Sequence, residues 1–464
     1  MHKDPHDKMP SVMEKLYTFN PKALWSQFWK ESFSFWMICF YMVLQYFDPL
    51  RIYHVLDFLP MDKVTLGLAL LTLPLDPRRR WVRDATNVWM TLFWLATLAS
   101  SAFATYPAIS WSHWFDFFEW YVIYFLIINT VTTSERYFIF VVIFLLANFK
   151  MSFFGARTWI TRGFGFVSWG IEGPPGFFQN SADLSTEMLM FAPVAFELAL
   201  FVRPRVKRVT YWFVMLGAVS GAMTVLGASS RGAQVALTAQ ATWIAIQRRL
   251  KLKVLLAIAL LAGLGWALLP AAEKARFTSA GTDNTSIQRL YYWTAGLKMI
   301  EHHPILGVGF FNFSPLYAVH DPYKLVHGTA ELPHNIFIQV GTDAGLIGLA
   351  IFLILIFRNF QIGTEIRRAC RNNKDAPEFA PSVARGLVIA TLGFVIAGQF
   401  NTVSYYPFLW INLALMVSLV NIVRMTAEER APVHLGSAPS GSQVTPPAPS
   451  APVHGDLPAT RNLQ

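Results

Sequence analysis

Long apolar stretches recur along nearly the whole of this 464-residue chain. Several approach the ~20 residues that a helix needs to span a bilayer. Apolar residues make up 54% of the chain and charged residues only 14%, which excludes an ordinary soluble domain. The sequence therefore predicts an all-α polytopic membrane protein with about 12 transmembrane helices, at residues 33–48, 57–75, 85–106, 115–132, 137–150, 184–202, 210–228, 231–247, 254–270, 335–358, 385–404 and 407–424.

The basic residues are distributed unevenly between the segments that join these stretches. If the N-terminus lies inside, the inward segments hold 27 of the 38 Lys and Arg residues, and the outward segments hold 38 − 27 = 11. Such a bias in short loops fixes membrane topology. It predicts both termini in the cytoplasm and a large outer loop between helices 9 and 10. The net charge of +10 is then a topology and lipid-headgroup signal, so we expect no nucleic-acid partner.

Three regions follow from this pattern. Residues 1–32 carry Trp25, Phe28 and Trp29 beside lysines, which predicts a cytoplasmic amphipathic lead-in. No small-residue cleavage site follows the first stretch, so we expect a retained helix rather than a signal peptide. Residues 33–430 form the transmembrane domain, with long outer segments at 151–183 and 271–334. Residues 431–464 are rich in Pro, Ala, Ser and Gly and predict a disordered tail.

Arginines gather on the outer segments. Arg231 follows Ser229-Ser230, either of which is suited to cap the eighth helix and expose amide donors at its positive end. Arg157, Arg162 and Arg289 lie on the two long outer segments, and the four converge if these segments fold over the helices. Arginine binds phosphate bidentately, so the set suits a diphosphate. The alternatives are an interfacial anchor for Arg231 and solvated loop charges for Arg157 and Arg162.

A titratable side chain lies where the outer loop meets the tenth helix. His334 falls between Pro333 and Asn335, and a helix is predicted to follow at 336–360. Histidine titrates near neutrality and suits general-base work, and the neighbouring amide suits orienting it or a substrate hydroxyl. The alternative is a structural hydrogen-bond donor that holds the turn. Upstream, a second helix is predicted at 286–302, ended by Pro304 and the Gly307-Val308-Gly309 turn.

Histidines also recur every seven residues, at His320, His327 and His334. Prolines interrupt any continuous helix through them and no carboxylate completes a ligand set, so no metal site is predicted. Cys39 lies in the first predicted helix and Cys370 in a cytoplasmic segment, so the two are not expected to pair.

The order of short motifs resembles the bacterial O-antigen ligase and O-antigen polymerase superfamily over roughly residues 85–420. The motifs are Ser230-Arg231-Gly232, Arg289-x-x-x-Trp293, His303-Pro304-x-x-Gly307-x-Gly309, His334-Asn335 and Gly345-Leu346-Ile347-Gly348. Arg157 and Gly173 also fit an arginine-then-glycine spacing of the family's polymerases. One departure is the stretch 399–402, where family ligases can carry an acidic residue and this chain has no carboxylate.

The resemblance implies a GT-C-like, metal-independent and cofactor-free glycosyltransferase of the bacterial inner membrane. Its donor would be a polyprenyl-diphosphate-linked glycan, its acceptor a lipid-anchored sugar or glycan, and its active site would face the periplasm. Matching the motifs residue by residue assigns catalysis to His334, Arg231 and Arg289. Substrate binding is expected of Arg157, Arg162, Asn335, Trp293, Gly307 and Gly309.

Two alternatives remain beside an inverting O-antigen ligase. An O-antigen or exopolysaccharide polymerase differs only in its acceptor. A lipid-linked glycan transporter expects polar residues near mid-membrane and broken helices along a path. In this sequence the reactive groups cluster at the outer face instead. A structural scaffold would leave the outer arginines unexplained.

Overall fold

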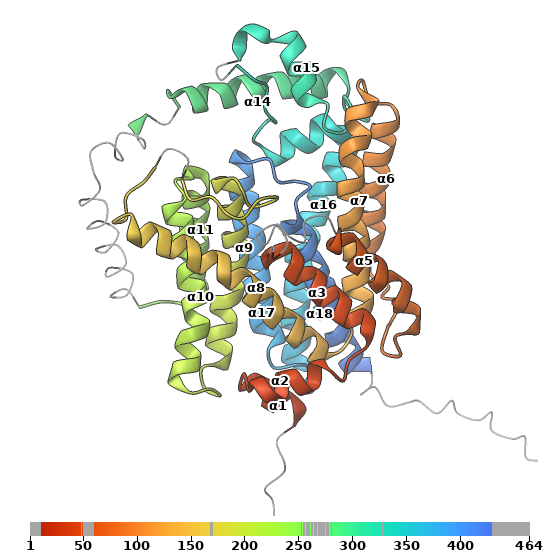
Figure 1. Cartoon of the computed structure of the whole chain (residues 1–464), viewed down its shortest axis with the longest axis vertical. Helices are drawn as coiled ribbons and strands as arrows, with labels where there is room; N and C mark the ends of the chain where they lie inside the picture. The colour runs from red at the N-terminus through yellow and green to blue at the C-terminus, as the bar shows by residue number, and fades with distance from the viewer. Residues whose placement is uncertain are drawn as a thin grey trace, which may run out of the picture.

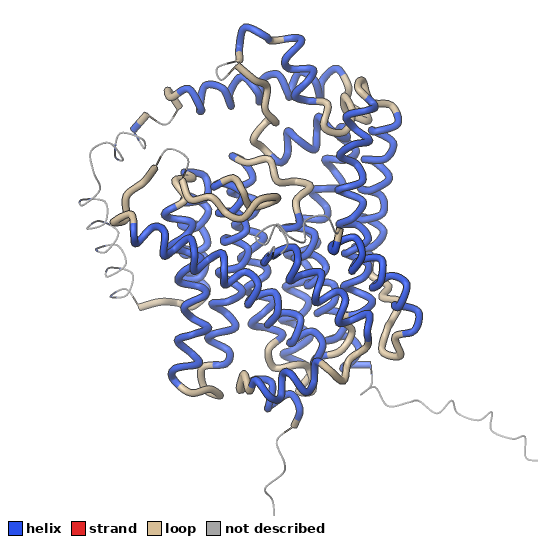
Figure 2. The backbone as a smooth tube through the Cα atoms, in the orientation of Figure 1, coloured by secondary structure: helices blue, strands red, loops and turns tan. Residues whose placement is uncertain are grey.

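The computed structural model describes residues 11–47, 60–167, 170–251, 278–279, 281–325 and 328–428, together with isolated positions at 49, 253, 256, 260, 263, 267 and 274. Within these ranges every regular element is a helix (Figure 2). Most long helices run upright in Figure 1, and α8 crosses them obliquely. The end that carries α1 and α2 is called the inner end and the end that carries α14 and α15 the outer end, after the predicted topology (Figure 1).

The elements follow one another along the chain in a simple order. The lead-in holds α1 (Val12–Tyr17) and α2 (Pro21–Phe28), and the outer loop holds α14 (Asn284–His302), α15 (Phe313–His320) and η3 (Pro322–Lys324). The bundle consists of α3 (Phe33–Phe47), α5 (Met61–Thr72), η2 (Leu73–Leu75), α6 (Ala85–Ala102), α7 (Pro107–Thr130), α8 (Ser134–Thr161), α9 (Ser181–Val202), α10 (Arg208–Gly227), α11 (Arg231–Gln247), α16 (Ile336–Asn372), α17 (Ala380–Ala397), η4 (Gly398–Phe400) and α18 (Pro407–Glu428).

Eleven of the twelve predicted apolar stretches coincide with helices from α3 to α18, and the stretch at 254–270 falls mostly outside the described residues. Six of the described helices are long and apolar enough to cross a membrane: α8, α9, α10, α16, α17 continued by η4, and α18. An all-helical membrane protein is therefore confirmed, while the count of about 12 spans stays a prediction. The predicted tail at 431–464 also lies outside the described residues.

Two helices extend well beyond the apolar stretches that predicted them. α8 ends at Thr161 rather than near residue 150, and α16 ends at Asn372 rather than near residue 358. In both cases the apolar run stops at a basic residue, Lys150 or Arg358. Lysine and arginine are good helix formers, so backbone hydrogen bonding continues after hydropathy has fallen. Hydropathy measures the apolar run, not the helix.

The inner end is held together by a buried ion cluster. The fully buried Arg136 guanidinium donates to Asp76 and Glu31, with both closest N–O distances 2.7 Å. Arg78 also pairs with Glu31, at 2.8 Å. A buried charge is tolerated only when such partners satisfy it. The cluster therefore holds the start of α8 against the segment just before α3, which carries Glu31, and the segment just after η2, which carries Asp76.

At the outer end, α16 is interrupted at Gly345, whose φ of 65° and ψ of −168° are not helical. A Cβ there would lie 2.2 Å from the carbonyl oxygen of Ile305, so only glycine fits. The interruption lets the Leu346 amide donate to the Pro304 carbonyl, at 2.7 Å, and the Val308 amide to the Thr342 carbonyl, at 2.8 Å. The loop after α14 is thereby attached to α16.

A second contact positions α11. Gln240, buried in the middle of that helix, donates through its amide nitrogen to the carbonyls of Leu189 in α9 and Ile389 in α17, at 2.8 and 2.9 Å. Buried polar groups are retained when their hydrogen bonds are satisfied, and here they bind three helices together. The N-terminal ends of α9 and α11 consequently lie near each other at the outer end.

Candidate functional site

A polar cavity of about 650 Å³ lies at the outer end of the bundle. It is formed where four helices begin, α9, α11, α14 and α16, with the segment that follows η4 beside them. Its lining includes all three residues for which catalysis was predicted. The lining residues are Glu172, Gly176, Gln179, Asn180, Ser181, Ala182, Asp183, Ser229, Ser230, Arg231, Gly232, Thr285, Arg289, His334, Phe400, Asn401 and Tyr406.

Arg231 is the first residue of α11, and its helix directs a positive N-terminal end toward the cavity. The Ser230 hydroxyl accepts from the Ala233 amide, so the predicted serine cap is confirmed for Ser230. The Arg231 guanidinium donates to Asp283, at 2.9 Å, and to the Ser286 hydroxyl, at 3.4 Å. A guanidinium and a helix N-terminus at one place form an anion-binding arrangement.

Arg289 approaches the same cavity from α14. Its Nε is buried and has no hydrogen-bond partner among the described residues. Burial lowers the pKa of its guanidinium, and the nearby positive charge of Arg231 lowers it further. Arginine nevertheless stays cationic at neutral pH. A half-buried cation with an unsatisfied donor, next to a second cation, favours an anion between the two.

Asp283 is a carboxylate next to Arg231, just outside the residues that line the cavity. It caps α14, because its side chain accepts from the Ser286 amide at 3.1 Å, and it also pairs with Arg231. Burial alone would raise the pKa of Asp283, but hydrogen bonds from Ser286 and Arg231 outweigh burial and hold the pKa below its usual range. The sequence interpretation missed this residue, although an aspartate just before a predicted helix is a recognisable capping signal.

His334 is held in a constrained turn immediately before α16. Its backbone has a φ of 49°, in the left-handed region that non-glycine residues adopt infrequently. The turn is fixed by the Trp293 indole, which donates to the Pro333 carbonyl at 3.0 Å, and by the Thr402 hydroxyl, which accepts from the His334 amide at 2.9 Å. The imidazole Nε2 lies 2.8 Å from a carboxylate oxygen of Glu331.

A carboxylate reaches the cavity from a direction that the sequence did not indicate. Asp183, in the first turn of α9, accepts a hydrogen bond from the Asn401 side chain at 2.9 Å. The two residues are 218 positions apart. An acid from another helix thus lies beside the stretch 399–402, which itself carries no carboxylate, and no local motif reveals this contact.

Two predicted substrate-binding arginines do not line this cavity. Arg157 lies exposed on α8, beyond the apolar part of that helix rather than in a loop. Arg162 ends α8, and its guanidinium donates to the Gly170 carbonyl at 3.0 Å. Arg162 is nonetheless close to the lining, because its partner Gly170 packs against Ser181. A substrate contact for either one stays a prediction.

The other predicted binding residues support the site from outside the lining. Asn335 caps α16, because its side-chain oxygen accepts from the amides of Phe337 and Ile338 at 2.9 and 3.2 Å. Trp293 holds the turn before His334, as described above. Gly307 and Gly309 adopt positive φ angles of 72° and 117° in the loop docked against the α16 interruption. These backbone conformations indicate that the two glycines shape the loop. A direct contact between either glycine and the substrate stays a prediction.

Within the described ranges, no group of three or more His, Cys, Asp or Glu side chains is placed to hold a metal ion. His327, one of the three evenly spaced histidines, lies outside those ranges. His320 ends α15, whereas His334 precedes α16, so the even spacing in sequence belongs to two separate elements. Cys39 and Cys370 are both unpaired.

Apolar helices of spanning length, with two arginines and a histidine lining a polar cavity at one end, define a membrane protein with a candidate anion-handling active site. Residues 216–353 match the family model described as O-antigen ligase. The matched segment runs from α10 into α16 and contains Arg231, Arg289 and His334. Over this segment it confirms the resemblance to the O-antigen ligase superfamily that the sequence predicts. No curated protein sequence matches the chain.

Proposed function

We propose that the protein transfers a glycan from a polyprenyl-diphosphate donor to an acceptor hydroxyl at the periplasmic face of the bacterial inner membrane, with both termini in the cytoplasm. The carrying observation is that Arg231, Arg289 and His334, from three separate elements, line one cavity. The family match supports a ligase- or polymerase-like membrane enzyme. The excess of basic residues on the inward segments supports the orientation.

The donor's diphosphate takes the place between the two guanidinium groups. Arg231 brings the N-terminal end of α11 with it, and Arg289 brings a buried donor that has no partner in the described residues. The prenyl tail extends sideways into the bilayer. As the bond to the sugar breaks, negative charge grows on the diphosphate, and preorganised cations stabilise that charge. Removing one such hydrogen-bond donor raises the activation free energy by ~3 kcal/mol.

His334 accepts the proton of the acceptor hydroxyl. The acceptor oxygen forms a bond to the anomeric carbon, the bond from that carbon to the diphosphate oxygen breaks, and polyprenyl diphosphate leaves. Attack opposite the leaving group inverts the anomeric configuration. A positioned general base typically raises the reaction rate ~10²–10⁴-fold. No step requires a metal or an organic cofactor.

Glu331 selects the basic nitrogen of the imidazole. When Nε2 carries the proton, it donates to the Glu331 carboxylate 2.8 Å away, which leaves Nδ1 as the acceptor. A carboxylate that holds a histidine in one tautomer and stabilises its charged form is the logic of catalytic triads. Glu331 is then a positioning residue, because it acts through His334.

The test uses purified full-length protein in liposomes with a polyprenyl-diphosphate glycan and candidate acceptors. The release of polyprenyl diphosphate and the mass of the glycan product are measured in the same reaction. We expect His334→Ala to lower the transfer rate at least ~100-fold, whereas His320→Ala, in the same outer loop, leaves it unchanged. Arg231→Lys and Arg289→Lys are each expected to lower the rate ~100-fold or more, because lysine cannot form the bidentate contact. Full activity of His334→Ala would exclude the base assignment.

The same assay separates the alternatives. Transfer to a lipid-anchored core sugar indicates a ligase, and extension of a second donor glycan indicates a polymerase. Movement of donor across the liposome membrane without a new glycosidic bond indicates a transporter and would refute the proposal. Arg157→Lys and Arg162→Lys test whether arginines outside the cavity also contribute: retained transfer shows that Arg231 and Arg289 suffice.

A further inference from the structure

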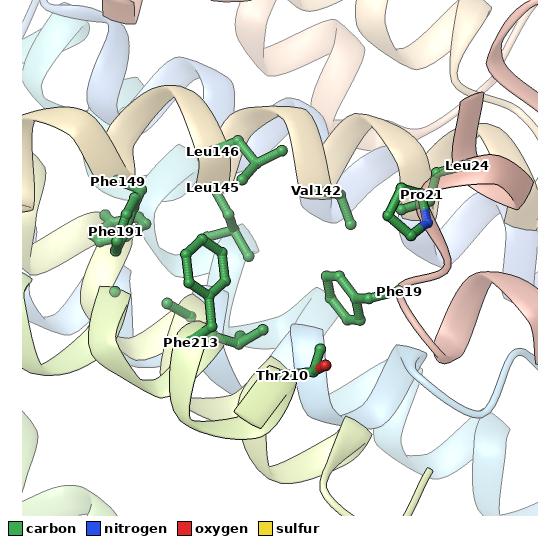
Figure 3. A pocket seen from close by; sticks show the side chains of 13 residues that line it. Phe19, Pro21, Leu24, Val142, Leu145, Leu146, Phe149, Phe191, Thr210 and Phe213 are labelled. Atoms are coloured by element: carbon green, nitrogen blue, oxygen red, sulfur yellow. The ribbon is translucent and has the colours of Figure 1, made fainter. Parts of the chain in front are cut away.

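An apolar groove of about 360 Å³ lies near the inner end of the bundle, far from the polar cavity. Its walls come from α8, α9, α10 and the lead-in (Figure 3). The volume falls within the range typical of small-ligand sites. Thr210 is its most polar lining residue, and the remaining lining residues are Phe19, Pro21, Leu24, Val142, Leu145, Leu146, Phe149, Phe191, Ala195, Phe213, Val214 and Gly217.

The groove is separated from the transfer site along α9. Asp183 of the polar cavity lies near the start of that helix, and Phe191 and Ala195 of the groove lie 8 and 12 residues later. At 1.5 Å per residue, the two sites are about 12–18 Å apart along the helix axis. In Figure 3, Phe19, Pro21 and Leu24 of the lead-in lie at one end of the groove. The groove therefore lies in the half of the bundle that carries the lead-in, which the topology prediction places toward the cytoplasm.

Basic residues surround this inner end of the groove. Lys22 is exposed and lies between the lining residues Pro21 and Leu24. Lys207 and Arg208 are exposed and precede Thr210 by less than one helical turn. Within the described part of the chain, no carboxylate pairs with any of these three side chains. The apolar walls of the groove suit an acyl chain, and the three cations at its end suit an acidic headgroup.

The start of α10 adds donors to the same place. Lys207 is the N-cap residue, and it provides no side-chain hydrogen bond to the first amides of the helix. Free amides at a helix N-terminus attract phosphate. Arg205 is engaged elsewhere, since it pairs with Glu378 and stacks over the Phe201 ring. Arg203 likewise lies over the Tyr211 ring, and Lys22, Lys207 and Arg208 remain available to a headgroup.

We propose that this groove binds one anionic glycerophospholipid from the inner leaflet. One acyl chain occupies the space between α8 and α10, and the phosphate contacts Lys22, Lys207 and Arg208 at the start of α10. The bound lipid joins the lead-in to the transmembrane helices, because Phe19 and Leu24 supply one wall. The site is independent of the proposed glycan transfer.

The test compares lipid retention by full-length protein purified from nanodiscs containing phosphatidylglycerol and phosphatidylcholine in equal amounts. Wild type is expected to retain about one phosphatidylglycerol per chain in preference to phosphatidylcholine. The variant Lys22→Gln/Lys207→Gln/Arg208→Gln should lose that preference at least ~10-fold. Its matched control is Arg80→Gln/Arg83→Gln/Lys374→Gln, which removes three other exposed inner-side charges and should retain the lipid.

A second variant tests the acyl chain separately from the charges. Val214→Trp fills the groove and should reduce the bound lipid while thermal melting shows that the protein remains folded. Equal retention by the two charge variants, or no preference in wild type, would overturn the proposal. Displacement of the phospholipid by polyprenyl phosphate would also overturn it, because the groove would then belong to the donor's tail. If Val214→Trp does not fold, the two charge variants alone decide the question.

Discussion

Replacing Asp283 by asparagine tests whether this carboxylate holds the place of the donor's diphosphate. Asp283 pairs with Arg231 at 2.9 Å, and the two side chains are 25% and 29% exposed. If diphosphate binds Arg231 bidentately, that ion pair must break first. Its strength therefore counts against donor binding, and removing the charge should tighten binding.

The size of the effect follows from the exposure of the pair. Partly exposed ion pairs are worth about 0.2–1 kcal/mol. With tenfold per 1.4 kcal/mol, the apparent KM for donor should fall about 1.4- to 5-fold. Asparagine is as good an N-cap as aspartate, so the start of α14 keeps its hydrogen bond from the Ser286 amide. The turnover number should change little, because the same transition state is stabilised.

The assay is a donor titration in liposomes at fixed acceptor concentration. Asp321→Asn provides a matched control, since Asp321 also pairs with a cation in the outer loop, but that cation, Lys324, does not line the cavity as Arg231 does. Asp283→Ala separates charge from capping, because it removes both and should lower the thermal stability by about 1 kcal/mol. An unchanged or higher KM in Asp283→Asn would show that the carboxylate positions Arg231 rather than competing with phosphate.

Three further predictions concern the support of the site. Trp293→Phe removes the indole bond to Pro333 and should lower the turnover number several-fold while the donor KM holds; steady-state kinetics checks this. Gly345→Ala places a Cβ 2.2 Å from a backbone oxygen and should lower the melting temperature and abolish transfer, whereas Gly67→Ala, with open space around it, should not destabilise the fold. If His334 is the base proposed above, Glu331→Gln should reduce turnover about 10-fold by releasing the imidazole, and an unchanged rate would exclude the positioning role of Glu331.

The positions of Arg231, Arg289 and His334 around one cavity could be predicted from the sequence because these residues lie at or near the starts of helices. Hydropathy located the starts of α11 and α16, and each start carries a reactive residue, Arg231 or His334. The helix that carries Arg289 was predicted at 286–302, and α14 begins at Asn284. Helix starts are marked by capping residues and by a change in composition, both of which are local signals.

The carboxylates of the site could not be predicted in the same way. Asp183 reaches the cavity only because α9 packs beside the segment after η4, 218 residues later. Glu331 precedes His334 by three residues but contacts the imidazole only because the backbone turns to a φ of 49°. Neither long-range packing nor a single left-handed residue leaves a periodic pattern in the sequence.

Gly307 and Gly345 belong to local sequence motifs, yet their role depends on long-range packing. Gly307 lies where a Cβ would approach the Thr342 carbonyl to 2.1 Å, and Gly345 lies where a Cβ would approach Ile305. The two glycines therefore permit one joint between the outer loop and α16, although in the sequence each belongs to a separate short motif. Because α14 ends at this joint and His334 precedes α16, the joint fixes the distance between Arg289 and the imidazole. The backbone freedom of these two glycines thus helps determine whether the charged residues meet.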